Sequence, residues 1–235
     1  MLKASKDRIA AKLTLTKKRF AAEVIGTFIV VVLATASVVI DSRMGGSLGL
    51  AFIAFAPFVG IALGVYLFGK ISMAHFNPAV SLAFLISGHI SKQQLLQYFA
   101  AEITGALLAS LFVMSVIGTE ASLGANTPDY SYPLPLVFGI EVLATALLMA
   151  VIYLVVYTKG LRGFGGLVIG GMVGLDIFCL AFISGASMNP ARSLAPALLS
   201  DVLGNLWLYW TATFIGSSFV ALLVRKKFMS SRKAD

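Results

Sequence analysis

The tripeptide Asn-Pro-Ala occurs twice in the chain, as Asn77-Pro78-Ala79 and as Asn189-Pro190-Ala191. Each copy opens an apolar stretch that is too short to cross a bilayer. Pro suits the first position of a helix because it needs no N–H there, and the preceding Asn is a favoured N-cap. A half-length helix that begins inside a membrane points its unpaired N–H groups and its positive dipole end at whatever lies beyond it. Two such ends can meet at mid-depth, which predicts a pore.

The two Asn side chains have a chemistry that suits water. If the amide oxygen of each caps its own helix, the NH2 group of Asn77 and of Asn189 is left free to donate. A passing water then offers its oxygen to two donors and cannot accept a proton from its neighbour. The two positive helix ends also oppose hydronium and other cations. In the alternative interpretation each Asn only caps its helix, and the two roles are compatible.

These half-helices require membrane-spanning helices to hold them. The chain is 59% hydrophobic and only 12% charged, whereas a soluble domain usually carries about 25% charged residues. Six segments are long enough to span a bilayer. The first is too long for a removable signal peptide, and no small-residue cleavage site follows it. The predicted spans cover roughly residues 20–40, 47–69, 95–118, 134–157, 164–183 and 205–224.

The distribution of charge predicts the topology. Of 18 Lys and Arg residues, seven precede residue 20 and five lie in the tail from Arg225 to Lys233. Six spans place both ends on one side, so the positive-inside rule makes both termini cytoplasmic. The net charge of +8 is therefore assigned to topology and lipid headgroups, and no nucleic-acid partner is expected. We expect basic tails at residues 1–18 and 225–235 and a single channel domain at residues 19–224.

The chain also repeats itself. Glu23-Val24-Ile25-Gly26-Thr27 is echoed by Glu141-Val142-Leu143-Ala144-Thr145, and the Asn-Pro-Ala motifs recur at a similar offset. This predicts two repeats, at about residues 19–118 and 134–224. Because each repeat has three spans, the second must enter the membrane from the opposite face. The predicted fold is an all-α polytopic membrane protein, in which an inverted repeat supplies six transmembrane helices and two re-entrant half-helices.

The strings His75-Phe76-Asn77-Pro78-Ala79-Val80 and Met188-Asn189-Pro190-Ala191-Arg192-Ser193 closely resemble those of the aquaporins, or major intrinsic proteins. The resemblance covers roughly residues 19–224. It implies an aquaporin-like fold, one pore per chain in the cell membrane and a homotetramer. It also implies that Glu23 and Glu141 hold the re-entrant loops by accepting backbone N–H groups, with a proton relay as the alternative. We assign no role to Glu102, which stands where the family more often has Gln, or to Asp176.

The segments before each motif are expected to turn carbonyl oxygens toward the lumen, because irregular backbone at membrane depth is tolerated only when it is packed in protein or lines a wet cavity. Such a ladder replaces the hydrogen bonds that water loses on entry. We interpret the His75 side chain as a packed loop histidine, with a titrating gate as the alternative. The predicted ladder consists of Met73, Ala74, His75, Gly185, Ala186 and Ser187.

Arg192 is costly inside a membrane, by ~2.5–3.5 kcal/mol on insertion scales, so function or pairing must offset it. By resemblance it belongs to an outer constriction, and an ion pair with a carboxylate is the alternative. Spacing from the motifs places Pro57, Ile177 and Ala186 at the other constriction positions. Strict water channels of the family commonly have an aromatic on the second span and a His on the fifth; at those positions this chain has Pro57, flanked by Phe55 and Phe58, and Ile177. We expect Pro57 to kink its helix and bring Phe58 into the gap.

The sequence therefore predicts a passive water channel without cofactor, metal or catalytic residues, which excludes protons and ions. Small, apolar Ile177 and Ala186 favour passage of small neutral solutes as well. A glycerol or small-solute facilitator of the same fold is the alternative, although Ser193 stands where glycerol facilitators typically have Asp. Two alternatives from other classes are a membrane-embedded enzyme, for which no nucleophile and base pair is evident, and a non-conducting junction protein.

Overall fold

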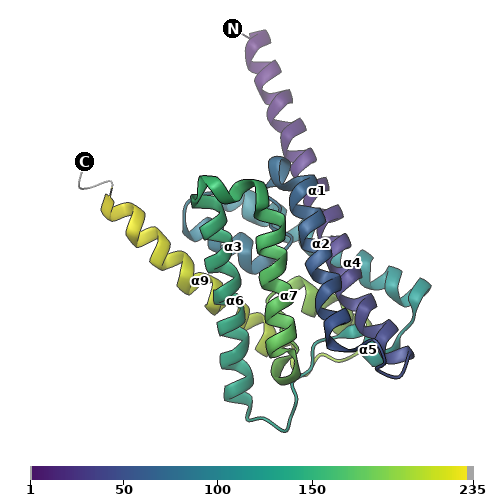
Figure 1. Ribbon diagram of the computed structural model, residues 1–235. Coiled ribbons are helices and arrows are strands. Elements are labelled where there is room, and N and C mark those ends of the chain that lie inside the picture. Colours follow the sequence, from purple (N-terminus) through teal and green to yellow (C-terminus); the bar gives the residue numbers. More distant parts are fainter. Residues whose placement is uncertain (1, 232–235) are drawn as a thin grey trace.

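The computed structural model describes the backbone of residues 2–231 and the side chains of residues 13–227. Every regular element in this part of the chain is helical (Figure 1). Six of these helices are long and apolar enough to cross a membrane, as predicted. The long helices are α1 (Leu2–Arg43), α2 (Gly49–Ser72), α4 (Lys92–Phe112), α6 (Leu134–Tyr157), α7 (Gly165–Ser184) and α9 (Leu206–Ser231). The short elements are α3 (Pro78–Ile86), η1 (Val113–Ile117), α5 (Glu120–Gly124), η2 (Lys159–Phe164) and α8 (Pro190–Leu199).

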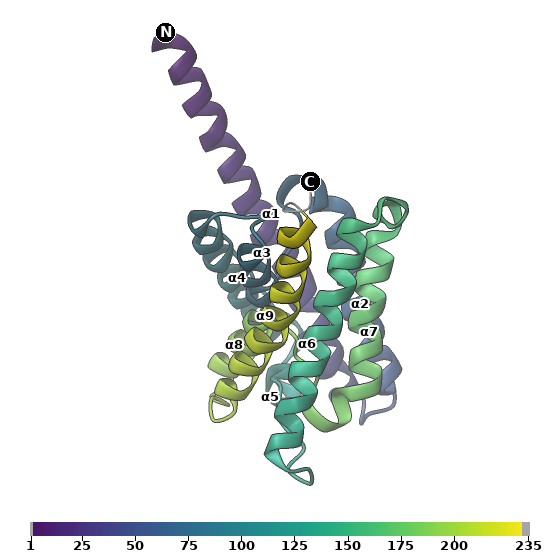
Figure 2. The same ribbon diagram turned by 90° about the vertical axis from the view of Figure 1, so that its left-hand side faces the viewer.

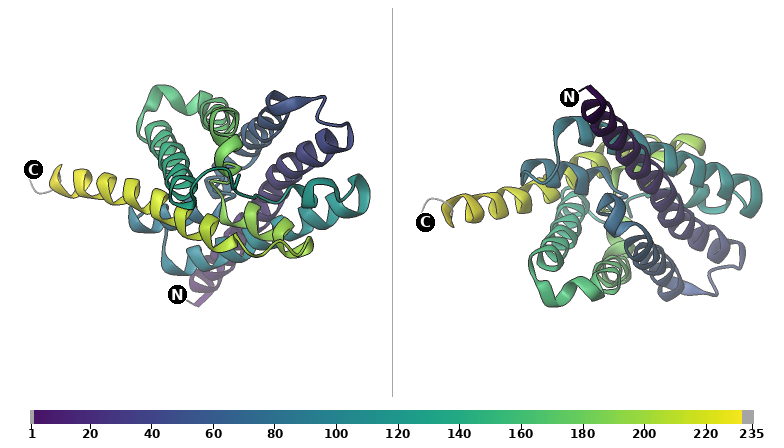
Figure 3. Two further views of the ribbon diagram at one scale, coloured as in Figure 1. Left: turned by 90° about the horizontal axis from the view of Figure 1, so that it is seen from below. Right: turned by 90° about the horizontal axis from the view of Figure 1, so that it is seen from above.

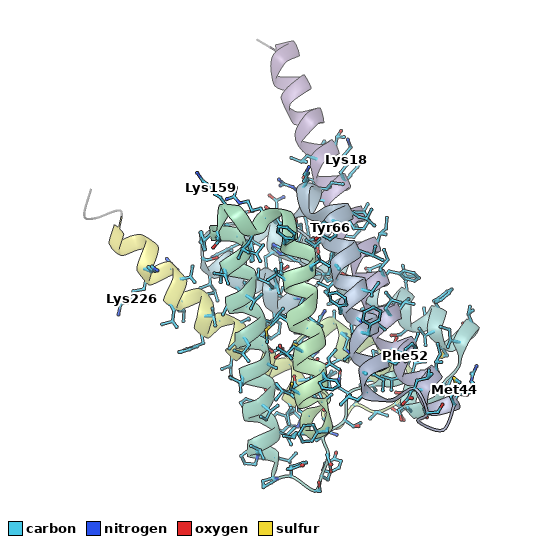
Figure 4. All side chains as sticks on the ribbon, in the orientation of Figure 1. Lys18, Met44, Phe52, Tyr66, Lys159 and Lys226 are labelled. Atoms are coloured by element: carbon cyan, nitrogen blue, oxygen red, sulfur yellow. The ribbon has the colours of Figure 1, made fainter. Side chains whose placement is uncertain are left out.

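The two ends of the chain lie at the same end of the helix bundle, here called the terminal end (Figures 1 and 2). Lys18 and Lys159 lie at this end, whereas Met44 lies at the opposite end (Figure 4). An even number of spans requires this arrangement. Helix α1 runs without a break from Leu2 into the first span, so most of the predicted basic tail at 1–18 is helical. Of the tail at 225–235, residues 232–235 lie outside the described residues.

The two half-helices enter the bundle from opposite ends, as an inverted repeat demands. Helix α3 lies in the terminal half of the bundle and α8 in the other half (Figure 2). Both begin at a Pro directly after an Asn N-cap. Viewed along the bundle, the N-terminal end of α1 and the C-terminal end of α9 extend outward from the other helices in different directions (Figure 3).

Equivalent helices of the two repeats meet at equivalent glycines. A Cβ atom on Gly105 of α4 would lie 2.4 Å from the Val24 carbonyl oxygen of α1. One on Gly216 of α9 would lie 2.4 Å from the Val142 oxygen of α6. Only a residue without a Cβ allows these backbones to approach so closely, which is the usual device of membrane helix packing. These contacts fix the outer helices around the two half-helices.

Candidate functional site: a pore between two half-helices

The loops that lead into the half-helices have the same backbone conformation in both repeats. At three equivalent positions before each motif, φ is positive, in the left-handed region that residues other than Gly seldom adopt. Since five of these six residues are not Gly, contacts with the rest of the fold must hold the loops. The pairs are Met73 (72°) with Gly185 (84°), Ala74 (53°) with Ala186 (44°), and Phe76 (51°) with Met188 (54°).

In the first repeat, Glu23 holds the loop from behind. Its two carboxylate oxygens accept the N–H groups of His75, at 3.1 Å, and of Phe76, at 2.7 Å. The Tyr98 hydroxyl donates to the Ser72 carbonyl at 2.6 Å and closes the end of α2. All non-helical N–H groups at membrane depth need such partners.

Glu141 does the same in the second repeat. It accepts the N–H of Ser187 at 3.0 and 3.1 Å and the N–H of Met188 at 3.3 Å. Tyr209 donates to the Ser184 carbonyl at 2.7 Å, in the place that Tyr98 takes in the first repeat. Neither Glu23 nor Glu141 has measurable exposure. Their contacts fit the loop-anchoring role that the resemblance implies.

Each Asn of the paired motifs caps its own half-helix. The Asn77 side-chain oxygen accepts the N–H of Ala79 at 2.9 Å. The Asn189 oxygen accepts those of Ala191 at 3.0 Å and Arg192 at 3.3 Å. Pro78 and Pro190, at the first helical positions, have no N–H to satisfy. The caps therefore point both amide NH2 groups away from their helices.

The same amide groups tie the two repeats together. Asn77 Nδ2 donates to the Met188 carbonyl at 2.8 Å, and Asn189 Nδ2 donates to the Phe76 carbonyl at 2.9 Å. Each bond uses one of the two amide hydrogens, so one hydrogen per Asn remains. The expectation that the whole NH2 group stays free is thus corrected. The ends of α3 and α8 meet through these reciprocal bonds.

A cavity of about 520 Å³ runs past both Asn side chains. At the terminal end it begins beside Arg162 and His89, and it extends as far as Arg192. Its walls are mostly apolar. Those of its lining residues that the sequence singled out are Pro57, Met73, Ala74, His75, Asn77, Ile177, Ala186, Ser187, Asn189 and Arg192.

A second cavity, of about 270 Å³, continues toward the opposite end of the bundle. Ala34, Ile177, Ala186 and Arg192 line both cavities, so they surround the junction between the two. Three of these four were expected at the constriction: Ile177 and Ala186 from motif spacing, and Arg192 from the family resemblance. Gly185 of the predicted ladder lines only the second cavity.

The expectation for Phe58 is wrong. Phe58 lines neither cavity and packs instead on the α2-facing side of α7, where Gly170 and Gly174 leave room for its ring. Pro57, directly before it, does line the larger cavity. Helix α2 continues through Pro57, and successive helical residues point about 100° apart, so the phenylalanine is turned away from the lumen that the proline lines.

Arg192 lies beside the junction with its side chain nearly buried. Its Nη1 donates to the Gly124 carbonyl at 2.7 Å. No carboxylate forms an ion pair with it among the described residues; the one salt bridge found there joins Arg43 and Glu120. Most of the five guanidinium N–H donors therefore remain for whatever passes through the junction.

The family model described as "Major intrinsic protein" matches residues 10–224. The chain belongs to the major intrinsic protein family. It is 36% identical over 214 residues to the "Glycerol uptake facilitator protein-like 6" of Lactiplantibacillus plantarum, covering 88% of this chain and 97% of that protein. It is also 33% identical to the "Probable aquaporin NIP7-1" of Arabidopsis thaliana, covering 90% of this chain and 77% of that protein.

The fold agrees with a solved structure of the same kind. The aquaglyceroporin from Plasmodium falciparum superimposes with a TM-score of 0.73 at 22% identity, over 90% of this chain and 94% of that one. The family match confirms the resemblance inferred from the paired motifs, and the superposition confirms the all-α fold with six spans.

Sequence reasoning missed two supports of the constriction in this major intrinsic protein. Gly124, which accepts from Arg192, ends α5, where three consecutive residues have left-handed φ angles of 49° to 59°. Asn126 donates from Nδ2 to the Gly185 carbonyl at 2.9 Å and accepts from Ser193 at 3.0 Å. Both lie in a loop without periodicity, so no sequence pattern pointed to them.

Proposed function

We propose that this chain is a passive channel for water which excludes protons and ions and also passes small uncharged solutes such as glycerol. The single observation that carries the proposal is the convergence of Asn77 and Asn189 on one cavity, each as the cap of a half-helix. Each Asn keeps one amide hydrogen for a passing molecule. A water that accepts both hydrogens turns its own hydrogens outward along the pore.

Proton exclusion follows from the same arrangement. A water held by two donors has no lone pair left for a proton from its neighbour. The positive ends of α3 and α8 and the charge of Arg192 all raise the energy of a cation in the passage. The anchoring carboxylates Glu23 and Glu141 lie behind the loops and bond to backbone N–H groups, so they are not exposed to the lumen.

Passage of small uncharged solutes is supported by the apolar residues that line the larger cavity together with Arg192. Ile177, Ala186 and Pro57 present apolar surface, while Arg192 offers N–H donors to a hydroxyl group. A solute with a carbon skeleton on one side and hydroxyls on the other matches such a wall. Relatives named for glycerol uptake and for water channels alike agree with this range of solutes.

By family resemblance the chain forms a homotetramer in the cell membrane, with both termini in the cytoplasm.

Purified protein in liposomes tests the proposal by stopped-flow light scattering. A sucrose gradient measures water flux, and a glycerol gradient then measures solute entry. We expect faster osmotic shrinkage than in protein-free vesicles, and glycerol entry that is slower than water flux. No rise in osmotic permeability would reject the water function. Glycerol flux equal to water flux would instead make the chain a solute facilitator.

A further inference from the structure

Two hydrogen bonds in series lead from the pore wall to a carboxylate inside the bundle. The Ser81 hydroxyl donates to Glu102 Oε1 at 2.6 Å, and the same Ser81 Oγ lies 2.8 Å from His75 Nδ1. His75 lines the larger cavity, whereas Ser81 and Glu102 have no measurable exposure. Glu102 therefore reaches the pore wall through the Ser81 and His75 side chains and through a hydrogen bond with the Asn77 backbone, and the function proposed above assigns it no part.

The direction of these bonds fixes the state of the His75 ring. A carboxylate can only accept hydrogen bonds, so with Glu102 ionised the single hydrogen of the Ser81 hydroxyl goes to Glu102. Toward His75 it can then only accept, so His75 Nδ1 must carry a hydrogen. In a neutral imidazole this leaves Nε2 without one. The ring is also held by Phe84 and Tyr98, with centroids 4.4 and 5.0 Å from its own.

The second repeat contains the matching serine with a different acceptor. Ser193, equivalent to Ser81, bonds with Ser187 before the second motif, and donates to Asn126 Oδ1 at 3.0 Å. Thr213 takes the place of Glu102 in α9, but its hydroxyl donates to the Tyr209 carbonyl of its own helix at 2.6 Å. In both repeats the serine thus gives its hydrogen to an oxygen outside the half-helix. Glu102 supplies that oxygen where no loop residue does.

We propose that Glu102 is a positioning residue of the pore: by taking the Ser81 hydrogen, it makes Ser81 the acceptor for His75 Nδ1–H and so fixes the ring orientation and tautomer of His75 beside the lumen. The ring beside Asn77 is then held in one tautomer, with its Nε2 atom buried and without a hydrogen-bond partner among the described residues. Without the acceptor, Ser81 is free to donate to His75 Nδ1, and the ring must move its hydrogen to Nε2.

The tautomer can be observed directly. The chain has two histidines, so a His89→Asn background with ¹⁵N-labelled histidine leaves only His75 in solid-state NMR spectra of the protein in lipid. With Glu102 present, we expect the Nδ1–H tautomer. In Glu102→Leu, which keeps the volume but removes the acceptor, we expect the ratio to shift toward Nε2–H by about tenfold, since one directed hydrogen bond is lost.

A second variant tests the proposal if Glu102→Leu does not fold. Ser81→Ala removes the hydroxyl that connects His75 to Glu102, so it should also abolish the preference of His75 for the Nδ1–H tautomer. Thr213→Val is the matched control, because it removes a buried polar group at the equivalent place in the other repeat, and it should leave the His75 spectrum unchanged. An Nε2–H tautomer in the wild type, or Nδ1–H retained in both Glu102→Leu and Ser81→Ala, would overturn the proposal.

A permeability measurement separates positioning from mere packing, and this arm alone rests on the proposed water function. With His89 restored, we expect Glu102→Leu and Ser81→Ala to lower water permeability per channel by a factor of about three to ten relative to Thr213→Val, the scale of one hydrogen bond. A shifted tautomer with unchanged permeability would refute the effect on the pore. If the wild type itself conducts no water, the proposed function fails while the NMR result still decides the role of Glu102.

Discussion

At the scale of single residues, the amide groups of Asn77 and Asn189 divide their hydrogen bonds between structure and passage. The oxygen of each caps a helix, one hydrogen binds the opposite loop, and one hydrogen is left over. An aspartate could cap the helix as well but has no hydrogen for either of the other bonds. Only an amide can accept one hydrogen bond and donate two, which explains why Asn, rather than any other N-cap residue, stands at both positions.

The anchoring glutamates offer a test at this scale. Glu141 accepts from two backbone N–H groups with two oxygens, and Glu141→Gln leaves one acceptor oxygen and places an NH2 group against an N–H. A buried unpaired donor costs about 1–3 kcal/mol. We therefore expect Glu141→Gln to lower the melting temperature of the protein in detergent. The control Glu120→Gln, at an exposed ion pair, should change it little, and equal melting of Glu141→Gln and the wild type would contradict the anchoring role.

The constriction offers a second test. Ala186 lines the junction of both cavities, whereas Ala181 lines only the second. Ala186→Leu adds volume at the junction of the two cavities, so we expect glycerol flux to fall about tenfold, the scale of an overpacked contact, and water flux to fall much less. Liposome flux assays with both solutes measure this. Ala181→Leu should behave as the wild type, and equal slowing of water and glycerol by Ala186→Leu would refute the placement of the constriction.

The sequence makes its functional residues recognisable in two ways, by internal repetition and by an unexpected charge. Asn77, Asn189, Glu23 and Glu141 are repeated within the chain, so the chain supplies its own comparison. Arg192 stands out because a charge is rare at membrane depth. Phe58 was misplaced because spacing gives the position of a residue along a helix but not which neighbour its ring meets; the glycines of α7 decide that.

At the scale of elements, the half-helices are held by loops whose conformation no local pattern favours. Met73, Ala74 and Phe76 all have positive φ angles, which cost energy for residues with a Cβ. The bonds to Glu23 and the packing of the Phe76 ring against Gly26 and Gly64 compensate. The six spans could be predicted from hydrophobicity, although not the extension of α1 back to Leu2. The loop conformations, in contrast, depend on contacts between segments far apart in sequence.

Helix contacts at glycine give a prediction at this scale. Gly105→Ala or Gly216→Ala would place a Cβ 2.4 Å from a carbonyl oxygen of the neighbouring helix, so the helices must move apart, at about 1–3 kcal/mol. We expect a lower melting temperature for both variants. Gly171→Ala is the matched control, because nothing lies within 4 Å of its Cβ position; if it destabilised the protein as much as the other two, close approach would not be the explanation.

At the scale of the whole molecule, His89 connects the two repeats at the terminal end. Its ring lies 2.8 Å from Ser87 Oγ, after α3, and 3.2 Å from the Tyr157 hydroxyl at the end of α6. Burial lowers the pKa of His89 below its ordinary value of 6.5. The folded protein therefore binds a proton at His89 less readily than the unfolded chain does.

This connection makes stability depend on pH. Because the pKa of His89 is lower in the folded state, its contribution is fully present above about pH 6.5 and is lost as the pH falls through the folded-state pKa. We expect the melting temperature to drop between pH 7.5 and pH 5, and to drop less in His89→Asn. Melting curves of the two proteins across this range measure the difference, and parallel curves would exclude His89 as a cause.

The central proposal concerns the whole molecule: water crosses the membrane through the cavity that runs past the joined tips of α3 and α8, and protons do not. Liposomes that contain the purified protein and an enclosed pH dye report both fluxes in the same preparation, by light scattering after an osmotic step and by dye response after a pH step. We predict a large rise in water permeability with a proton leak no greater than that of protein-free lipid. Unchanged water permeability, or a proton leak that rises together with water flux, would contradict the account.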